Sequence, residues 1–280
     1  MKCKFEFAFA CAAAVIVGGE NRASADVIAA WNFNNYSTGT VITGPTANSG
    51  DNAATATAMS LGMTNSYTYA NGEGPGAVDG SNIAANSVAP GDNFWRIVGN
   101  SNSKNAGAGM ANGWNTAAPQ YSQGAQFNVS TTGFSNLQLT FGWQATSQGV
   151  ADLQVRSSTN GGATWTNVGS SIEMTPADVN VGVDYFTFSL AAGTNAVELV
   201  SAYNPTLGTT YASATSAAAG APVAINNNSG NWRFTDVSIS GAVVSTPEPS
   251  SMLLCFVAGG GAAFFRWRKR KSAEASAKVA

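Results

Sequence analysis

The chain of 280 residues is 44% hydrophobic and only 10% charged, and it contains no histidine, which removes the usual serine and cysteine triads and most zinc sites. Between residues 26 and 249, four basic residues stand against twelve acidic ones, a net charge of −8 that argues against a basic footprint for nucleic acid or anionic membrane. That stretch is long enough to bury one sizeable core.

The first 25 residues have the pattern of a secretory signal peptide. Lys2 and Lys4 precede a mostly apolar stretch, and Ala23 and Ala25 flank a small residue in a small-x-small cleavage site. We expect cleavage after Ala25. All three cysteines lie outside residues 26–249, so the exported part cannot use disulfides and depends on its core: Cys3, Cys11 and Cys255.

Short runs of alternating apolar and polar residues follow, bounded by turn residues, and they predict β-strands. They lie at 27–33, 94–98, 124–129, 137–143, 151–155, 165–168, 185–190, 197–203 and 232–241. Long amphipathic helical patterns are absent, and residues 205–230 predict a long loop or hairpin excursion. We therefore expect an all-β fold across residues 26–244, an antiparallel two-sheet sandwich with a jelly roll as its leading form.

Residues 158–165 match the Asp-box pattern Ser-x-Asp-x-Gly-x-Thr-Trp, with Asn160 in the place of the aspartate. Asn160 can bond its own backbone, and Gly161 and Gly162 supply positive φ, so the segment predicts a tight hairpin with Trp165 packed over the turn. Sialidase-type propellers carry several copies of this pattern. One copy in a chain too short for six blades favours a plain hairpin.

The last predicted strand has two apolar pairs that are out of step. Trp232 and Phe234 share one face, whereas Val237 and Ile239 share the other, so we expect a β-bulge near residues 235–236.

The Trp-x-Phe opening at Trp31 and the Trp-Arg-Phe-x-Asp-Val-x-Ile closing at Trp232 resemble lectin-like jelly-roll domains of exported bacterial proteins. We expect the first and last strands to be neighbours, with the C-terminal segment beside the N-terminus.

Two sets of residues are candidates for binding. Oxygen-rich loops make Asp51 and Asp92 candidate Ca²⁺ ligands, although no spacing matches a dedicated calcium loop. The resemblance to lectin-like sandwiches adds Asp236, in the last predicted strand, as the candidate for a Ca²⁺ site near the terminus. Trp114 and Tyr121 lie in a predicted loop region and are the candidate platforms for stacking on sugar rings. Each also has a structural interpretation, as a turn-stabilising carboxylate or as a core aromatic.

The C-terminus combines three features in a fixed order. Pro247-Glu248-Pro249-Ser250 precedes an uncharged apolar run of 15 residues, Ser251–Phe265. A transmembrane helix needs about 20 residues, and Trp267 as an interfacial anchor brings the segment near that length. A basic cluster follows, which the positive-inside rule keeps in the cytoplasm: Arg266, Arg268, Lys269, Arg270 and Lys271.

This combination resembles the PEP-CTERM sorting domain of exported bacterial proteins. The resemblance implies recognition and processing at Pro247, Glu248 and Pro249 by an exosortase, a membrane-embedded protease, and association with exopolysaccharide or biofilm matrix. The expected organisation is a signal peptide at 1–25, a β-sandwich ectodomain at 26–244, the sorting signal at 245–271 and a cytoplasmic tail at 272–280. A tail of this kind is unusual for the family, and a plain membrane anchor is the alternative.

We expect an exported, non-catalytic protein that is transiently anchored in the inner membrane and then reaches the cell surface or matrix, where it is structural or contacts glycan. One alternative is a calcium-dependent carbohydrate-binding module. The other is a glycan-active enzyme, which needs two carboxylates at a defined separation, and no such pairing is visible for Glu173 or Glu198. No nucleic-acid partner is expected, and Ca²⁺ is the one cofactor considered.

Overall fold

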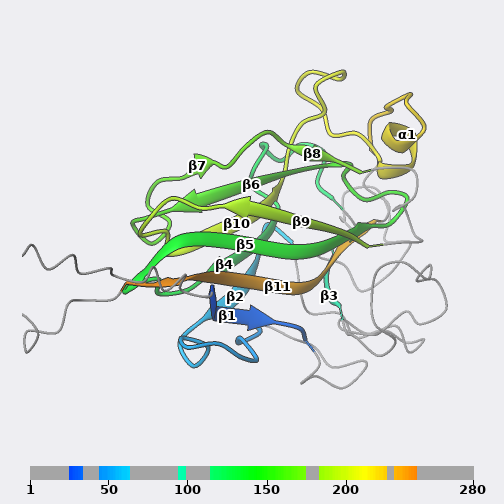
Figure 1. Ribbon diagram of the computed structural model, residues 1–280. Coiled ribbons are helices and arrows are strands. Elements are labelled where there is room, and N and C mark those ends of the chain that lie inside the picture. Colours follow the sequence, from blue (N-terminus) through cyan, green and yellow to red (C-terminus); the bar gives the residue numbers. More distant parts are fainter. Residues whose placement is uncertain are drawn as a thin grey trace, which may run out of the picture.

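Two antiparallel β-sheets pack face to face in the computed structural model, which describes residues 25–33, 44–63, 94–98, 114–174, 183–225 and 230–244 (Figure 1). This confirms the predicted all-β, two-sheet sandwich. Successive strands mostly alternate between the sheets, as they do in a jelly roll.

The front sheet, nearer the viewer in Figure 1, has the order β1-β11-β5-β9, and β3 continues the β1 edge of β11. Its strands are β1 (Asp26–Trp31), β3 (Trp95–Val98), β5 (Phe134–Ala145), β9 (Asp184–Ser189) and β11 (Asn231–Val243). The first and last strands are neighbours, with Asp26 opposite Gly241, so the prediction of adjacent ends is confirmed.

The back sheet has the order β2-β4-β10-β6-β7, and β8 also pairs with β6. Its strands are β2 (Thr57–Leu61), β4 (Gly124–Asn128), β6 (Asp152–Ser158), β7 (Thr166–Asn167), β8 (Ile172–Glu173) and β10 (Ala196–Ser201). The predicted hairpin at 158–165 joins β6 to β7, with Gly161 and Gly162 at positive φ as expected.

The long strand β11 contains the bulge that its apolar pattern predicts. The register with β5 shifts between Thr235 and Ser238, and Asp236 has a φ of 46°. Trp232 and Ile239, on either side of the shift, are both fully buried. The extra residue therefore returns both halves of the strand to the core.

Aromatic side chains fill the space between the sheets. Trp31 of the front sheet meets Phe127 of the back sheet edge-on, with ring centroids 5.0 Å apart. Trp232 contacts Trp143 at 5.2 Å, and its indole N–H donates to the Val150 carbonyl. Such offset and edge-on contacts add to the burial energy of the rings.

Three elements escape sequence prediction. β8, only two residues long, is identified by its pairing with β6. β2 lies in a weakly patterned stretch and is identified only by its pairing with β4. A five-residue helix, α1 (Ala214–Ala218), stands within the predicted loop at 205–230, where the Ser213 side chain caps its N-terminus by accepting from the Ser216 N–H. All three elements are short. Each is decided by a strand partner or by a capping contact, which the apolar periodicity does not reveal.

Candidate functional site

An ion pair lies on the outer face of the back sheet. Arg156 of β6 and Glu198 of β10 are register partners, and Arg156 Nη1 donates to Glu198 Oε2 at 3.0 Å. Their strand neighbours Val155 and Leu199 point into the core, so the pair points outward. Glu198 is nevertheless only 6% exposed, and this burial raises the pKa of its carboxyl although the Arg156 charge opposes the shift.

Two partly exposed aromatic rings flank the Arg156 guanidinium. Its central carbon lies 5.0 Å from the Tyr121 ring centroid and 5.7 Å from that of Trp165. These distances are within the range of cation–π attraction. Nε of Arg156 is buried and has no hydrogen-bond partner within the described ranges. The cation is thus held in place while part of its donor capacity stays unused.

Local structure fixes both rings. The turn before Trp165 is held by Asn160, whose side-chain oxygen accepts from the Thr164 N–H at 2.9 Å, and the Trp165 ring covers Gly162. Tyr121 adopts a φ of 67°, and its N–H donates to the Ser201 carbonyl at the end of β10. The rings therefore converge on Arg156 from two separate loops.

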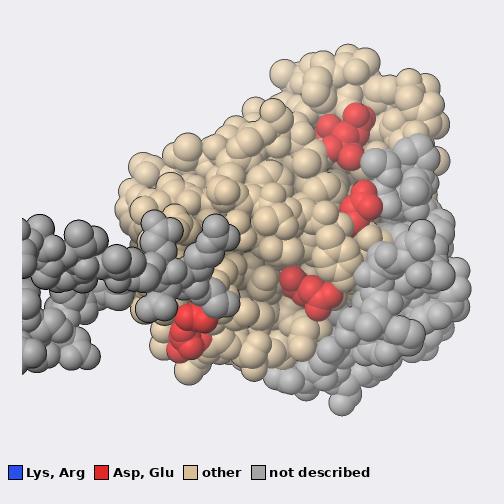
Figure 2. All heavy atoms as spheres, in the orientation of Figure 1, with Lys and Arg blue, Asp and Glu red and all other residues tan. Residues whose placement is uncertain are grey.

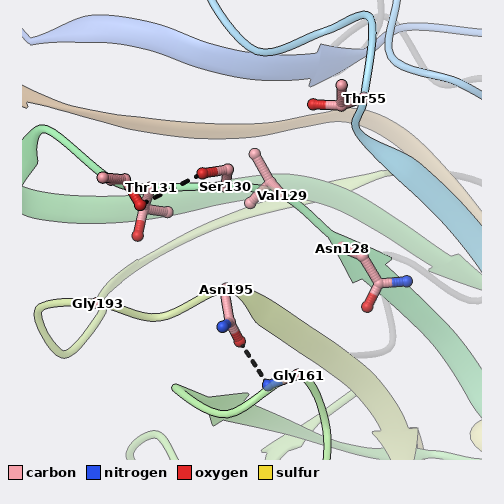
Figure 3. Close-up of a pocket in the computed structure, with 9 residues that line it drawn as sticks. Thr55, Asn128, Val129, Ser130, Thr131, Gly161, Gly193 and Asn195 are labelled. Carbon is pink, nitrogen blue, oxygen red and sulfur yellow. Dashed lines mark hydrogen bonds between the residues drawn. The ribbon is translucent and has the colours of Figure 1, made fainter.

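A polar pocket of about 440 Å³ lies at one end of the back sheet (Figure 3). Asn195, just before β10, accepts from the Gly161 N–H at 2.8 Å and so joins two of its walls. Hydroxyl, amide and backbone groups line the pocket together with the apolar Val129, and no charged group does: Thr55, Asn128, Val129, Ser130, Thr131, Thr132, Gly161, Gly193 and Asn195. Its volume is in the usual range for small-ligand sites.

The pocket and the ion pair belong to one continuous surface, which we call the back-sheet surface. Gln126 of β4 is the register partner of Glu198, and its amide donates to Asn128 Oδ1 at 2.7 Å. Asn128 lines the pocket. Aromatic faces, a cation and neutral hydrogen-bonding groups thus follow one another along the sheet, which are the groups that can stack on sugar rings and bond their hydroxyls.

Two carboxylates, those of Asp152 and Glu173, lie at the start of β6, at the end of the strand that is far from the pocket. Asp152 is 1% exposed, and Asn204 Nδ2 donates both to Asp152 Oδ2 at 3.0 Å and to Glu173 Oε1 at 3.1 Å. Burial raises the pKa of Asp152 to about 6; the Asn204 hydrogen bond opposes this and the Glu173 charge adds to it. Glu173, for which the sequence showed no pairing, is therefore a close neighbour of Asp152.

The structure separates the two predicted glycan contacts. Tyr121 lies on the back-sheet surface, partly exposed. The prediction for Trp114 is wrong: its ring is fully buried and lies 4.5 Å from the Trp232 ring, so it offers no face to a ligand. Sequence reasoning missed Arg156 as the cation between the rings and treated Trp165 only as a turn residue. The position of Trp165 directly after the Asp-box-like turn was the signal in the sequence that could have marked it as a candidate ligand contact.

Of the predicted calcium ligands, Asp51 and Asp236 lie at opposite ends of β1. Asp51 is exposed, and its N–H donates to the Val27 carbonyl near the start of β1. The carboxylate of Asp236 accepts a hydrogen bond from the Tyr185 hydroxyl, beyond the other end of β1. Asp92 lies outside the described residues. Within the described part of the chain, no group of three acidic or other ligating side chains is found.

The residues of the sorting segment, from Pro247 through the basic cluster to Lys271, lie outside the described residues, as does Ala23. Ala25 is exposed, immediately before β1. Among the helices that the structure describes, none is long and apolar enough to span a membrane.

No protein-family model and no curated protein matches this chain. Among solved structures, it is similar to the K1 cleaved adhesin domain of Lys-gingipain from Porphyromonas gingivalis W83, with 13% identity over 75% of this chain and 95% of that one and a TM-score of 0.36. It is also similar to a family 29 carbohydrate-binding module from Piromyces equi, with 10% identity over 67% and 92% of the two chains and a TM-score of 0.28. Likeness at these scores carries no argument about ligand or activity.

Proposed function

We propose that this protein is an exported, non-catalytic β-sandwich that contacts polysaccharide through the back-sheet surface. The observation that carries the proposal is the Arg156 guanidinium, which lies over the Tyr121 and Trp165 rings and is bound to a nearly buried Glu198. Replacing a buried ion pair with apolar side chains of the same size is often neutral or stabilising, so burial energy alone does not explain an ion pair on an outer sheet face. A sugar would stack on the partly exposed rings, and the hydroxyl and amide groups that line the pocket would bond its hydroxyls.

The binding test uses a broad glycan array and the full chain. The chain is expressed in a bacterium that exports it through its signal peptide, and is purified in mild detergent. Trp165→Ala should lower binding more than Trp165→Phe, because phenylalanine keeps an aromatic face. Tyr121→Ala should act like Trp165→Ala, whereas Val223→Ala, a change at an exposed residue in another region, is the control. If the wild-type protein bound no glycan on the array, the proposal would be refuted. Binding that a chelator abolishes would favour the calcium-dependent alternative.

We further propose that an exosortase sorts the protein at Pro247-Glu248-Pro249 after export. The sequence order of motif, apolar run and basic cluster supports this, together with a fold whose first strand begins directly after the expected signal-peptide cleavage site. Replacing Pro247 and Glu248 with alanine should leave the precursor in the membrane fraction. Unchanged release, with an unchanged C-terminal mass of the mature protein, would argue for a plain anchor.

The glycan-active enzyme has one observation in its favour. Asp152 and Glu173 accept from one amide nitrogen, so these oxygens lie within about 6 Å, a separation that a glycosidase pair can have. Against it, Asp152 is almost completely buried and lies at the far end of β6 from the pocket. Release of reducing sugar from a bound polysaccharide, lost in Asp152→Asn, would establish the enzyme; binding without release supports the proposal above.

A further inference from the structure

The outer face of the front sheet carries an exposed aromatic ring that lies along the sheet. Tyr185 of β9 is 44% exposed, and its hydroxyl donates to Asp236 Oδ2 at 2.8 Å. Asp236 belongs to β11, two strands away across β5. Because neighbouring strands are about 4.8 Å apart, the two backbones are separated by roughly 10 Å. The ring can reach Asp236 only by lying across β5.

Strand β5 has a glycine at the point where the ring crosses it. Gly142 is the register partner of Tyr185 on one side and of Thr235 on the other. A Cβ atom at Gly142 would lie 3.2 Å from Tyr185 Cε1 and 2.7 Å from Thr235 Cγ2. The missing side chain therefore lets one face of the ring settle against the sheet, and leaves the other face turned outward.

The bulge in β11 supplies the group that holds the ring. Asp236 has a φ of 46°, a left-handed conformation that aspartate tolerates better than most residues but that still costs free energy. The register shift between Thr235 and Ser238 places Asp236 as the extra residue on this face. The bulge thus restores the core pattern of β11 and also directs a carboxylate to the Tyr185 hydroxyl.

Neutral polar side chains continue the face beyond the ring. Two rows of register partners cross three strands, and they are Thr187, Thr140 and Ser238, then Ser189, Gln138 and Ser240. The Thr140 and Thr187 hydroxyl oxygens are 3.5 Å apart. Figure 2, which looks onto the front sheet, shows separate acidic patches. The basic Arg233 lies further along β11 on the same face, where its guanidinium donates to Gln144 Oε1 of β5. We call the ring and the two rows, whose own side chains are all uncharged, the Tyr185 platform.

We propose that the Tyr185 platform is a second polysaccharide site and that it takes an uncharged chain, so that one molecule bridges two chains. An outward aromatic face beside rows of hydroxyl and amide groups matches the apolar faces and hydroxyl edges of neutral sugars. The net charge of −8 over residues 26–249 and the acidic patches nearby disfavour a polyanion. The platform and the back-sheet surface lie on opposite outer faces of the sandwich, so two chains can be held without collision.

Affinity electrophoresis of the full chain tests this second site separately from the proposed function. The gels contain hydroxyethyl cellulose, galactomannan or xylan, with alginate as the polyanion. Tyr185→Ala should weaken retardation by a neutral polymer roughly three- to tenfold, the loss of one aromatic contact, with Tyr185→Phe in between because it keeps the ring but not its hydroxyl. Val223→Ala is the control. The Tyr121→Ala/Trp165→Ala double variant should keep partial retardation, and adding Tyr185→Ala should abolish it.

Bridging has its own measurement. Light scattering of a dilute neutral polymer should rise when wild-type protein is added, and should not rise with Tyr185→Ala or with the double variant. Complete loss of retardation in the double variant alone would overturn the second site and leave the proposed function standing. Complete loss of retardation in Tyr185→Ala, with retardation kept in the double variant, would support the Tyr185 platform and refute polysaccharide binding by the back-sheet surface. Wild-type retardation by alginate only, or by no polymer, overturns the Tyr185 proposal.

Discussion

Replacing Asp152 with asparagine should stabilise the protein at neutral pH. The Asp152 carboxyl is 1% exposed, and burial raises its pKa from 3.8 to about 6, with Asn204 opposing and Glu173 adding to the shift. Below pH 3.8 the group is neutral in both the folded and the unfolded protein. As the pH rises through 6, the folded protein must hold a carboxylate in a site that favours the neutral form, so stability present at low pH is lost.

The size of the effect follows from the shift. Each pKa unit is worth 1.36 kcal/mol, so a shift of about two units corresponds to at most about 3 kcal/mol above pH 7. The new amide of Asp152→Asn can still accept from Asn204, but its own N–H groups need acceptors, which reduces the gain. We therefore expect a stabilisation of about 1–3 kcal/mol at pH 8 that shrinks towards pH 4.

Urea unfolding followed by tryptophan fluorescence between pH 4 and pH 8 measures this difference. Glu173→Gln is the matched control, because Glu173 is exposed and its charge is the smallest of the three causes that act on Asp152. It should keep most of the wild-type pH dependence. A stability difference between Asp152→Asn and wild type that does not change with pH, or a less stable variant at pH 8, would refute the reasoning.

Three further predictions concern packing and local structure. Trp232→Ala removes a fully buried ring and should lower the free energy of unfolding by about 3–5 kcal/mol in urea; a loss below 1 kcal/mol would contradict its central place in the core. Gly124→Ala should destabilise far more than Gly133→Ala in thermal unfolding: both glycines have positive φ, but only the Gly124 Cβ would meet a backbone oxygen, that of Leu199. Ser213→Ala should cost about 1 kcal/mol through loss of the cap of α1, seen as faster amide exchange there, and unchanged exchange would argue against the cap.

Local patterns predicted those features that depend on neighbours in the chain. The Asp-box-like turn follows from Asn160 and two glycines, and the bulge in β11 follows from two apolar pairs that one extra residue brings into phase. Trp114 shows where this fails. Its surroundings in the sequence are loop-like, but its burial is decided by Trp232, more than a hundred residues away.

The candidate surfaces could be predicted only in part for the same reason. Tyr121 was identified as an aromatic in a loop, whereas its relation to Arg156 depends on how β4, β10 and β6 line up. The link between Tyr185 and Asp236 spans 51 residues and requires both to lie beside β5. Alternation places Tyr185 on an outer face, but register decides what lies next to it.

The sequence by itself determined the period-two strands, the absence of histidine, the absence of cysteine and the acidic charge of residues 26–249, and the positions of the turns, because each depends on composition or on residues within a few positions. The tertiary structure alone decided which polar and aromatic side chains became neighbours. Sheet order and register bring together residues that are distant in the chain, and a shift of one residue would turn each of them to the other face. The contacts of Arg156 with Glu198, Tyr121 and Trp165 and the Tyr185 platform both depend on that register.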